Sequence, residues 1–416
     1  MNHVSPVMPE VNFGVDPVED LYERMAQLHA EGRRVVPVRY IDDIYWLILP
    51  HGVLGEAFQD EVNLPSRAAY ERHSMPSMGR TMQAMAGNEH RINRALASGP
   101  FQPAAIRKSV EGLLVPVAND LIDALVGTKG TDLVDSYTCR YPFRIISGML
   151  GVPIEDERAV QDWVWGVLRF PWEPERALKA KADLDAYLQP ILDDRRANPG
   201  DDIISKLATA EVEGRRLTDE EIRSFIRLLY PAGAETTYLL MGSMMLEVLR
   251  DPALKQRLLD NPQDRNVAVE EALRKHGSTS LLPRYTEKEV TIAGVTIPAN
   301  SWLLYGIVPA NHDPAEFPDP LKFSLDRGPI RHLAFGKGPH FCLGSHLARE
   351  ELRVSLSLLL ERLPGLRIAE GATPKITGAV LRGVLKLPVE YDAVLPPRSY
   401  EAEKRSNLNA SLGATG

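Results

Sequence analysis

The chain has 416 residues, of which 44% are hydrophobic and 25% charged, and its formal net charge is −8. These values lie close to the average for folded globular proteins, and they exclude collagen-like, intrinsically disordered and membrane-embedded classes. The acidic balance argues against a nucleic-acid partner, because such proteins usually present a basic face to the phosphate backbone.

The two cysteines, Cys139 and Cys342, are too few and too far apart in sequence for the disulfide framework of a secreted scaffold. The N-terminus has neither the apolar core of a signal peptide nor the run of about 20 apolar residues that spans a bilayer. The sequence therefore predicts a cytoplasmic protein without a membrane anchor. Polar composition predicts a flexible N-terminus at 1–15 and a disordered tail at 396–416, around a single domain at 16–395.

Apolar residues recur at spacings of three and four along much of the chain, which is the pattern of amphipathic helices. In chain order this pattern predicts helices at 19–30, 104–125, 155–168, 176–196, 219–249, 265–275 and 343–363. Short segments flanking turns predict strands at 34–40, 44–49, 289–292, 295–297 and 385–391. Helices with a few peripheral antiparallel strands indicate a mainly α (α+β) architecture rather than alternating βαβ units.

One predicted helix, at 219–249, combines small residues with an acid and two hydroxyls in the run Pro231-Ala-Gly-Ala-Glu-Thr-Thr237. In an ordinary helix Thr236 would bond back to the carbonyl of Ala232 and Glu235 would be solvated, and this interpretation stays open at the level of sequence. Pro231 has no N–H to donate to the preceding turn, so we expect the helix to loosen or kink there.

A glycine-rich loop places Cys342 directly before the last predicted helix, in the run His332-Leu-Ala-Phe-Gly-Lys-Gly-Pro-His-Phe-Cys-Leu-Gly-Ser-His-Leu-Ala-Arg349. Gly336 and Gly338 allow the backbone to turn tightly and to approach a flat ligand closely. A thiolate at this position would be stabilised by backbone N–H groups and by the positive end of the helix. The alternative is a buried, inert cysteine, which is the commonest state of an intracellular cysteine.

The loop matches the motif F-G-x-G-x-H-x-C-x-G at all six specified positions, and residues 232–236 match A-G-x-(D/E)-T. Through these motifs the chain resembles the cytochrome P-450 family of haem-thiolate monooxygenases. The resemblance covers roughly residues 16–392 and implies the single-domain fold of that family. It also implies that Cys342 is the proximal metal ligand of haem b (iron protoporphyrin IX), with electron donation from sulfur that favours O–O cleavage.

On the oxygen side, the resemblance implies that Ala232 and Gly233 let the helix lie close to the haem and leave room for O2. Thr236 would donate a hydrogen bond to O2. Glu235 would connect the same site to solvent protons through intermediate waters. Thr236 and Glu235 are thus the candidate catalytic residues.

The resemblance also implies how the haem is held. Phe335 would shield the sulfur and Gly336 would let the loop approach the haem. Cations or hydrogen-bond donors are needed at the edge that carries the two propionates. Four side chains match the family at this edge: His90 and Arg94 in the spacing H-x-x-x-R, Arg284, and His340. Any one of them taken alone would be interpreted as an ordinary surface cation.

A third motif, E-x-x-R, is matched by Glu271 and Arg274, whose spacing lets them pair along one helical face. In the family this pair supports the segment that leads into the cysteine loop, together with a further basic residue. Lys322 occupies the position that is often arginine, but it cannot form a bidentate fork, so Arg327 is the alternative third member. We assign this group to folding rather than to chemistry.

The substrate pocket can be located by the resemblance, although its contents vary between members. The expected lining is 63–86, 163–174, 229–239, 278–282 and 380–382. Four methionines in the first segment suit an adaptable apolar pocket or a plain core: Met75, Met78, Met82 and Met85. We expect a lid over the substrate pocket near four aromatic residues: Trp163, Trp165, Phe170 and Trp172. We expect a small or medium-sized apolar substrate that is hydroxylated or epoxidised.

Members of the family usually receive electrons from a ferredoxin or flavodoxin with its NAD(P)H-dependent reductase, and we expect such partners here. Four cations could form a basic docking surface on the cysteine side, or could be ordinary surface charge: Lys337, Arg331, Arg349 and Arg91. Two other functions remain open, a peroxygenase driven by hydrogen peroxide and a haem-based sensor or binder without turnover. The acid–hydroxyl pair of Glu235 and Thr236 argues against both.

Overall fold

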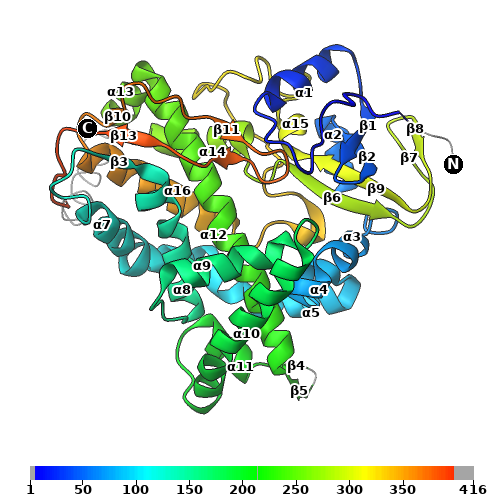
Figure 1. Cartoon of the computed structure of the whole chain (residues 1–416), viewed down its shortest axis with the longest axis horizontal. Coiled ribbons are helices and arrows are strands. Elements are labelled where there is room, and N and C mark those ends of the chain that lie inside the picture. The colour runs from blue at the N-terminus through cyan, green and yellow to red at the C-terminus, as the bar shows by residue number, and fades with distance from the viewer. Residues whose placement is uncertain (1–4, 213, 398–416) are drawn as a thin grey trace, which may run out of the picture.

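The computed structural model describes residues 5–212 and 214–397, and Figure 1 shows them as a helical body with small sheets at its margins. The mainly α class expected from the sequence is confirmed. The expected disordered tail falls, from residue 398 onward, outside the described residues, as do residues 1–4. No helix in the described ranges combines the length and the apolar character needed to cross a membrane.

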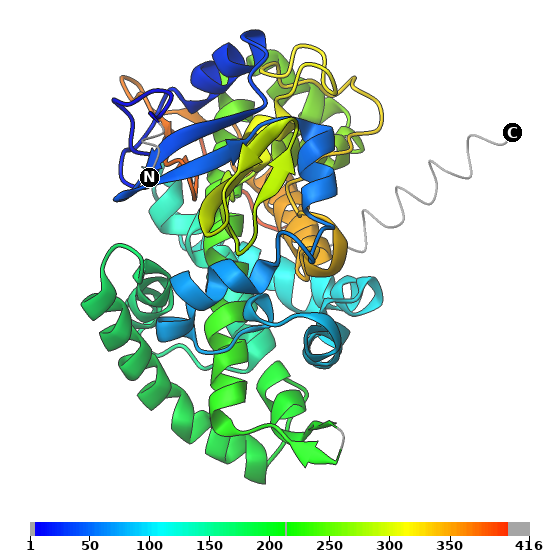
Figure 2. The ribbon, with the colours of Figure 1, turned by 90° about the vertical axis from the view of Figure 1, so that its right-hand side faces the viewer.

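Helix α12 (Asp219–Arg250) runs through the middle of the molecule and is its structural axis (Figures 1 and 2). It begins with a capping box, in which the Thr218 N–H donates to the Glu221 carboxylate over 2.8 Å and the Glu221 N–H donates to the Thr218 hydroxyl. Most of its central residues are buried, as expected for a helix surrounded by others. The helix is continuous through Pro231, so the missing N–H does not break it.

The helices that pack against α12 include α8, α9, α10, α14 and α16. Four of these five agree with the predicted boundaries to within a few residues, whereas α8 was not predicted. Their bounds are α8 (Arg140–Leu150), α9 (Glu157–Gly166), α10 (Pro174–Ala197), α14 (Asp264–His276) and α16 (Ser345–Arg362). The remaining helices are α1 (Leu21–Ala30), α2 (His51–Ala57), α3 (Ser66–His73), α4 (Met75–Met78), α5 (Gly87–Ser98), α11 (Ile203–Thr209), α13 (Pro252–Asp260) and α15 (Ile307–Asn311).

The prediction of one unbroken helix at 104–125 is wrong in one respect. The structure divides it into α6 (Pro103–Ser109), a π turn (Val110–Leu114) and α7 (Val115–Asp123). Pro116 lies in the first turn of α7, where its missing N–H leaves a backbone carbonyl of the preceding turn without its α-helical partner. The wider π turn lies directly before this position and accommodates the irregularity.

A four-stranded sheet has the order β1–β2–β9–β6. Its strands are β1 (Val35–Tyr40), β2 (Asp43–Ile48), β9 (Ser301–Gly306) and β6 (Leu281–Thr286). The β1–β2 hairpin was predicted, whereas β6 and β9 were not. Neither missed strand alternates apolar and polar residues, because β9 is largely buried on both faces and β6 carries Pro283 and Arg284. Strand β6 matters for the site, since it positions Arg284.

The other strands are short. Strands β7 (Val290–Ile292) and β8 (Val295–Ile297) form the predicted hairpin, and their two turn residues, Ala293 and Gly294, both have positive φ. Only the end of the strand predicted at 385–391 is found, as β13 (Pro388–Glu390). It pairs with two other strands, β10 (Arg367–Ile368) and β3 (Gly130–Asp132). Two further pairs are β11 (Ile376–Thr377) with β12 (Gly383–Val384), and β4 (Glu211–Val212) with β5 (Arg215–Arg216).

The segment 5–15 is attached to the sheet, contrary to the flexible N-terminus that the sequence predicted. Val11 and Phe13 are buried in the apolar cluster beside β1, and the Phe13 N–H donates to the Arg39 carbonyl over 2.9 Å. Farther along, the Trp172 indole N–H donates to the Gly14 carbonyl. The prediction failed because two apolar residues in a polar segment show no periodicity, yet they suffice to hold it against a core.

Arg227, a buried arginine of α12, connects three segments of the chain. Arg227 of α12 is fully buried and pairs with Asp185 of α10 and with Glu220 of its own helix. Its Nε donates to the Met78 carbonyl over 3.0 Å. Gly79 follows with φ 77°, and a Cβ there would lie 2.8 Å from the Arg227 guanidinium. Two carboxylates offset the cost of burying this cation.

Candidate active site

The cysteine loop is closed by its own backbone before α16 begins. The Cys342 N–H donates to the Phe335 carbonyl over 2.9 Å. Gly336 and Gly338 have φ values of 67° and 72°, which L residues rarely adopt. A Cβ on Gly338 would lie 2.8 Å from the Phe58 carbonyl oxygen. Glycine is therefore required where the loop passes the end of α2.

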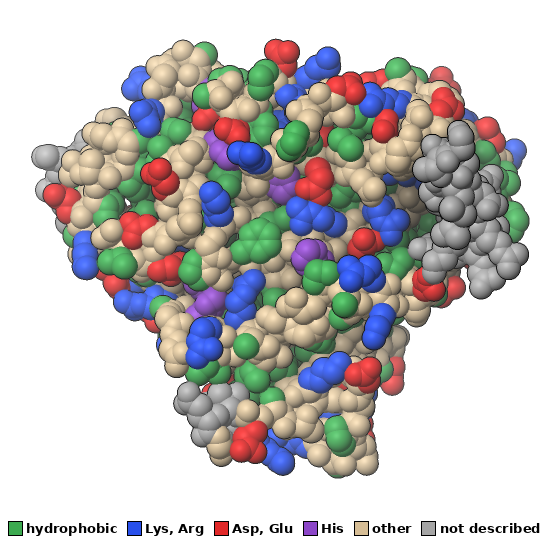
Figure 3. Space-filling view, turned by 180° about the vertical axis from the view of Figure 1, so that it is seen from behind, with side chains coloured by type: hydrophobic (Ala, Val, Ile, Leu, Met, Phe, Trp, Pro, Cys, Tyr) green, Lys and Arg blue, Asp and Glu red, His purple; other side chains and the backbone are tan. Residues whose placement is uncertain are grey.

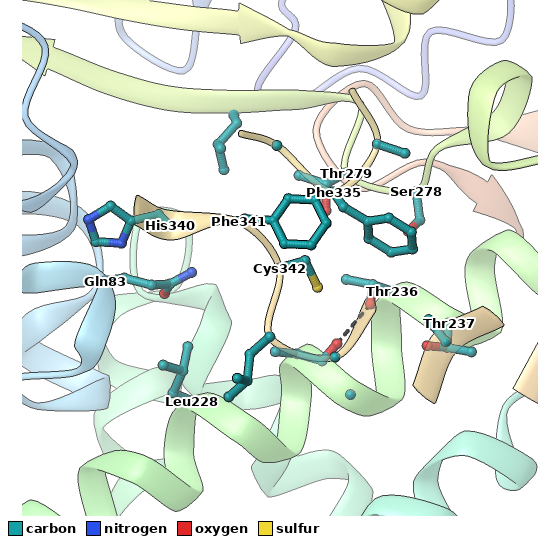
Figure 4. Close-up of a pocket in the computed structure, with 18 of the residues that line it drawn as sticks. Gln83, Leu228, Thr236, Thr237, Ser278, Thr279, Phe335, His340, Phe341 and Cys342 are labelled. Atoms are coloured by element: carbon teal, nitrogen blue, oxygen red, sulfur yellow. Dashed lines mark hydrogen bonds between the residues drawn. The ribbon is translucent and has the colours of Figure 1, made fainter. Parts of the chain in front are cut away.

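The Cys342 sulfur projects into a cavity of about 300 Å³ and points toward α12 (Figure 4). Burial raises the pKa of the Cys342 thiol, while the Gly344 N–H and the charges of Arg94 and Arg349 lower it. Phe335 lines the same cavity beside the sulfur, and the Arg349 guanidinium lies 4.6 Å from the centre of its ring. The cysteine that the sequence identified is thus directed at a ligand-sized space.

The opposite wall of the cavity is formed by α12, through Ala232, Gly233, Thr236 and Thr237 (Figure 4). The Thr236 hydroxyl donates to the Ala232 carbonyl over 2.7 Å, as the ordinary helical interpretation predicted. A hydroxyl that donates to a carbonyl still has lone pairs with which to accept. In this conformation Thr236 therefore offers an acceptor, rather than a donor, to the cavity.

Glu235 is adjacent to Thr236 in sequence but does not line the cavity. Burial raises the pKa of Glu235 to about 7, against an opposing effect of the Arg169 charge. The Glu235 side chain is half-buried rather than fully exposed, and its role stays a prediction. A carboxyl with a pKa near neutrality can both take up and release a proton under physiological conditions.

The four predicted cations and imidazoles lie together at one rim of the cavity: His90, Arg94, Arg284 and His340. Arg284 is only 4% exposed, and its guanidinium lies 4.9 Å from the ring of Tyr305. The Arg94 guanidinium donates to the Phe341 carbonyl over 2.6 Å. Within the described residues neither arginine has a carboxylate within 4.0 Å. The charge of Arg284 acts on the Glu61 carboxylate without forming a direct ion pair. Two guanidinium groups without a direct ion pair fit a site for an anionic group.

The two imidazoles of this rim, of His90 and His340, contact each other in a tilted arrangement, with ring centroids 4.1 Å apart and an angle of 41° between the ring planes. Burial lowers the pKa of His90 to about 4, and the neighbouring charges of His340 and Arg94 add to this effect. His340 Nε2 lies 3.6 Å from a carboxylate oxygen of Glu61. His90 is therefore a neutral donor at neutral pH, whereas His340 has a carboxylate beside it. The sequence contained no signal for Glu61.

The cavity lining agrees with the expected pocket segments only in part. Segments 63–86, 229–239 and 278–282 each contribute, through residues such as Gln83, Leu229 and Ser278. Segments 163–174 and 380–382 do not line the cavity. The latter lies behind Ser278, because the Arg382 N–H donates to the Ser278 carbonyl over 2.8 Å.

Of the four methionines, only Met82 lines the cavity. Met78 and Met85 are buried elsewhere and Met75 is 38% exposed. Sequence reasoning also missed Glu351 of α16, a fully buried carboxyl in the cavity wall. Burial of an acid cannot be recognised from a helical pattern alone.

The E-x-x-R pair forms a buried ion pair below the cysteine loop. Glu271 and Arg274 are both fully buried, and their side chains meet at 2.8 Å. The Arg327 Nε donates to the same Glu271 carboxylate over 2.9 Å, whereas Lys322 contributes only its backbone carbonyl. Of the two candidates for the third member, Arg327 is therefore the one whose side chain contacts Glu271.

The four cations proposed for a docking surface differ in their availability. Arg349 is bound to both carboxylate oxygens of Glu270, at 2.6 and 3.0 Å. Lys337, Arg331 and Arg91 are exposed. Figure 3 shows the face opposite to that of Figure 1, where Lys and Arg side chains are interspersed with Asp and Glu. The basic docking surface stays a prediction.

The sequence model of one family, described as Cytochrome P450, matches residues 18–264 and 265–393 of this chain. The chain belongs to the cytochrome P450 family. Among curated cytochromes P450, the mycinamicin IV hydroxylase/epoxidase of Micromonospora griseorubida is 33% identical over 382 residues, with 88% of this chain and 96% of that protein covered. The monooxygenase PikC of Streptomyces venezuelae is 31% identical over 404 residues, covering 93% and 94%.

Solved structures of cytochromes P450 show the same fold. Myxobacterial CYP267B1, in complex with myristic acid, has a TM-score of 0.83 at 30% identity, with 90% of this chain and 97% of that chain covered. A mutant of P450 EryK, in complex with erythromycin B, has a TM-score of 0.81 at 29% identity, covering 92% and 100%. The fold predicted from the sequence is therefore confirmed.

The cytochrome P450 family implies a haem-thiolate cofactor, and the residues of this cavity fit it. A single soft sulfur faces an apolar space, as a thiolate-ligated iron in a flat macrocycle requires. Arg94 and Arg284 lack carboxylate partners at the rim where two propionates would lie. Cys342, whose sulfur faces this space, stays the candidate metal ligand.

Proposed function

We propose that this cytochrome P450 inserts one oxygen atom from O2 into a small or medium-sized apolar substrate, by hydroxylation or epoxidation. Electrons would come from a separate ferredoxin or flavodoxin and its NAD(P)H-dependent reductase. One observation carries the proposal. The Cys342 sulfur faces Thr236 across an apolar cavity, and unpaired guanidinium groups lie at its rim. Membership of a monooxygenase family supports the same reaction class.

The proposed holding groups for haem b are Cys342 on the sulfur side and His90, Arg94, Arg284 and His340 at the propionate edge. When bound, the haem supplies the iron that activates O2, and its thiolate ligand favours O–O cleavage. Ala232 and Gly233 present almost no side chain, so α12 can lie close to the reacting atoms. Gly233 in turn packs against Ile146, which a Cβ would approach within 3.1 Å.

Thr236 and Glu235 have separate roles in the proposed mechanism. The Thr236 proton is committed to the Ala232 carbonyl, so its oxygen accepts a hydrogen bond from water or from an O–H group in the cavity. This acceptor holds the last proton donor in place beside the reacting atoms. Glu235, with a pKa near 7, takes protons from solvent and passes them on through water.

The substrate class follows from the cavity walls. Ile146, Leu228 and Leu282 are among the apolar lining, and Gln83 is one of few polar groups on that side. The Gln83 amide N–H donates to the Tyr70 hydroxyl over 3.2 Å, so its carbonyl can accept from a substrate. We propose a largely apolar substrate with one hydroxyl or similar donor. Two relatives are named as a mycinamicin IV hydroxylase/epoxidase and a vitamin D(3) 25-hydroxylase, which supports an organic substrate that is hydroxylated or epoxidised.

The experiment that tests the proposal is the absorption spectrum of the dithionite-reduced protein with carbon monoxide, in wild type and Cys342→His. We expect a strongly red-shifted Soret band in the wild type and its loss in the variant, because only thiolate ligation gives that shift. A globin-like band in folded wild type would remove the basis of the proposal.

Turnover assays distinguish the monooxygenase from the two alternative functions, a peroxygenase and a haem sensor or binder. Product formation with peroxide alone, at the rate obtained with the full electron-transfer chain, would indicate a peroxygenase. A red-shifted spectrum without consumption of reduced pyridine nucleotide, for any substrate and competent carrier, would indicate a sensor or binder. The raised pKa of Glu235 next to Thr236 favours the monooxygenase, since a peroxide-driven reaction does not need the same supply of protons.

A further inference from the structure

Helix α9 carries a stripe of polar groups at intervals of four residues, Glu157, Gln161 and Trp165, which places them along one side of the helix. Arg169 continues the series in the turn that follows. The stripe lies outside the cavity described above. Polar side chains are unusual at these positions, because α9 packs against both α10 and α12 and this side of the helix is largely enclosed.

Three atoms of the stripe are buried and have no hydrogen-bond partner among the residues that the structure describes: Glu157 Oε1, Gln161 Nε2 and Trp165 Nε1. Gln161 as a whole is only 7% exposed. An unsatisfied buried polar atom costs about 1–3 kcal/mol, and nearly all such atoms in proteins bind a protein group or an ordered water. Three unpartnered atoms in succession therefore indicate a row of water sites.

The outer end of the stripe is anchored near the surface. Glu157 uses its other oxygen, Oε2, to accept from Arg144 of α8 at 2.9 and 2.7 Å, and Arg140 lies 3.9 Å away. The two arginines are about one third exposed and the Glu157 side chain is 15% exposed. The Glu157 carboxylate thus lies at the outer end of the stripe, beside two partly exposed arginines.

The inner end of the stripe reaches the part of α12 that carries Glu235. The Trp165 ring lies 5.8 Å from the ring of Tyr238, one helical turn after Glu235. Burial raises the pKa of the Cys139 thiol to about 12, and the carboxylates of Glu157 and Glu235 both contribute to this rise. Cys139 therefore lies close enough to both Glu157 and Glu235 to feel their charges. The charge of Arg169, which follows the stripe in sequence, lowers the pKa of Glu235.

We propose that Glu157, Gln161 and Trp165 line a water-filled passage between α8, α9 and α12 that carries solvent protons to Glu235. The inference rests on the proton-transfer role proposed for Glu235. In each transfer the Glu235 carboxylate takes a proton from the nearest water, that water takes one from the next, and the last is replenished from bulk solvent near Glu157. One proton enters for each proton that Glu235 passes on, and no redox step is involved.

A crystal structure of the haem-loaded protein that resolves ordered waters gives the first test. We expect waters within hydrogen-bond distance of Glu157 Oε1, Gln161 Nε2 and Trp165 Nε1, in an unbroken row that ends at Glu235. Direct bonding of Gln161 to Glu157, with apolar contacts around Trp165, would overturn the passage. This readout does not depend on any activity.

The second test measures proton access to Glu235 without turnover. At about pH 6 the carboxyl is largely protonated, and its infrared carbonyl band can be assigned by its absence in Glu235→Gln. The band shifts when H2O is replaced by D2O, and the rate of the shift reports proton exchange. We expect Gln161→Leu to slow this exchange by about tenfold or more, because it removes the central water-binding group but keeps the volume.

Trp165→Phe provides a second variant if Gln161→Leu fails to fold, since it removes only the indole N–H and keeps most of the ring. Gln27→Leu, at an exposed position of α1, is the matched control and should exchange at the wild-type rate. Wild-type exchange in both passage variants would exclude this route. If instead the passage is present but Glu235→Gln leaves turnover intact, the proton role of Glu235 fails while the passage stands.

Discussion

Thr236 and Glu235 are neighbours in the chain, yet they face different surroundings. Thr236 lies in the cavity wall opposite the Cys342 sulfur, while Glu235 does not line the cavity and burial raises its pKa to about 7. One residue therefore positions a hydrogen bond and the other exchanges protons. Their separation is a property of the helix, because side chains one residue apart point about 100° away from each other.

Replacing Thr236 by alanine tests the positioning role. Loss of the acceptor oxygen should lower product formed per reduced pyridine nucleotide by about tenfold or more and raise peroxide release correspondingly. The spectral change on substrate binding should stay the same. Thr236→Ser is the matched control, since it keeps the hydroxyl that donates to Ala232. Unchanged coupling in the alanine variant would refute the role assigned to Thr236.

Residues could be predicted from the sequence where their type is dictated by chemistry. Cys342, Thr236 and Arg284 were predicted because their positions match those that the cytochrome P-450 family uses for a thiolate, a hydroxyl and a propionate-binding cation. Glu351 and the polar stripe of α9 were not identified. Their importance depends on burial, and burial is decided by helices that approach from distant parts of the chain.

At the level of elements, long amphipathic helices such as α12 and α10 could be predicted because their apolar period is unambiguous over many turns. Strands β6 and β9 could not, since a central strand buried on both faces lacks alternation and resembles a short helical segment. The buried group around Glu271 lies between these cases. The pair Glu271 and Arg274 could be found as the motif E-x-x-R. Arg327 was considered as the third member because a guanidinium can form a bidentate fork and a lysine cannot.

Two single substitutions separate the candidates for that third member. Arg327→Ala removes a charge-assisted hydrogen bond to the fully buried Glu271 and should lower the free energy of unfolding by about 2 kcal/mol. Lys322→Ala should change it by less than about 0.5 kcal/mol, because only the backbone carbonyl of Lys322 is used. Urea unfolding of the holoenzyme measures both. Equal effects would contradict the assignment.

The cavity belongs to the molecule as a whole rather than to any one element. Its lining comes from segments that lie as far apart as Phe58 and Glu351, and helices α5, α12, α14 and α16 all contribute to its walls. A ligand that fills it therefore links parts of the chain that otherwise meet only through the core. Its distant origins also explain why the lining could be placed only approximately from sequence.

Haem binding should accordingly stabilise the entire fold. If haem binds only the native state, free haem at about 1,000 times its dissociation constant adds about 4 kcal/mol to the free energy of unfolding. Calorimetry of the apoprotein and the holoprotein should show a higher unfolding temperature for the latter. Coincident transitions would mean that haem does not bind in the cavity described here. Arg284→Leu should reduce the difference, since it removes the buried guanidinium at the propionate edge.

The buried arginine of α12 has a consequence for how relatives of this protein can diverge. Arg227 donates to the carbonyl of Met78, and the left-handed backbone of Gly79 leaves no space for a side chain beside the guanidinium. A side chain at position 79 would clash with the guanidinium. Loss of Arg227 would remove the buried partner of Asp185 and Glu220 and leave them Arg223, 3.9 and 3.5 Å away. Positions 79 and 227 lie far apart in the sequence, and we expect substitutions at the two positions to be correlated among relatives of this protein.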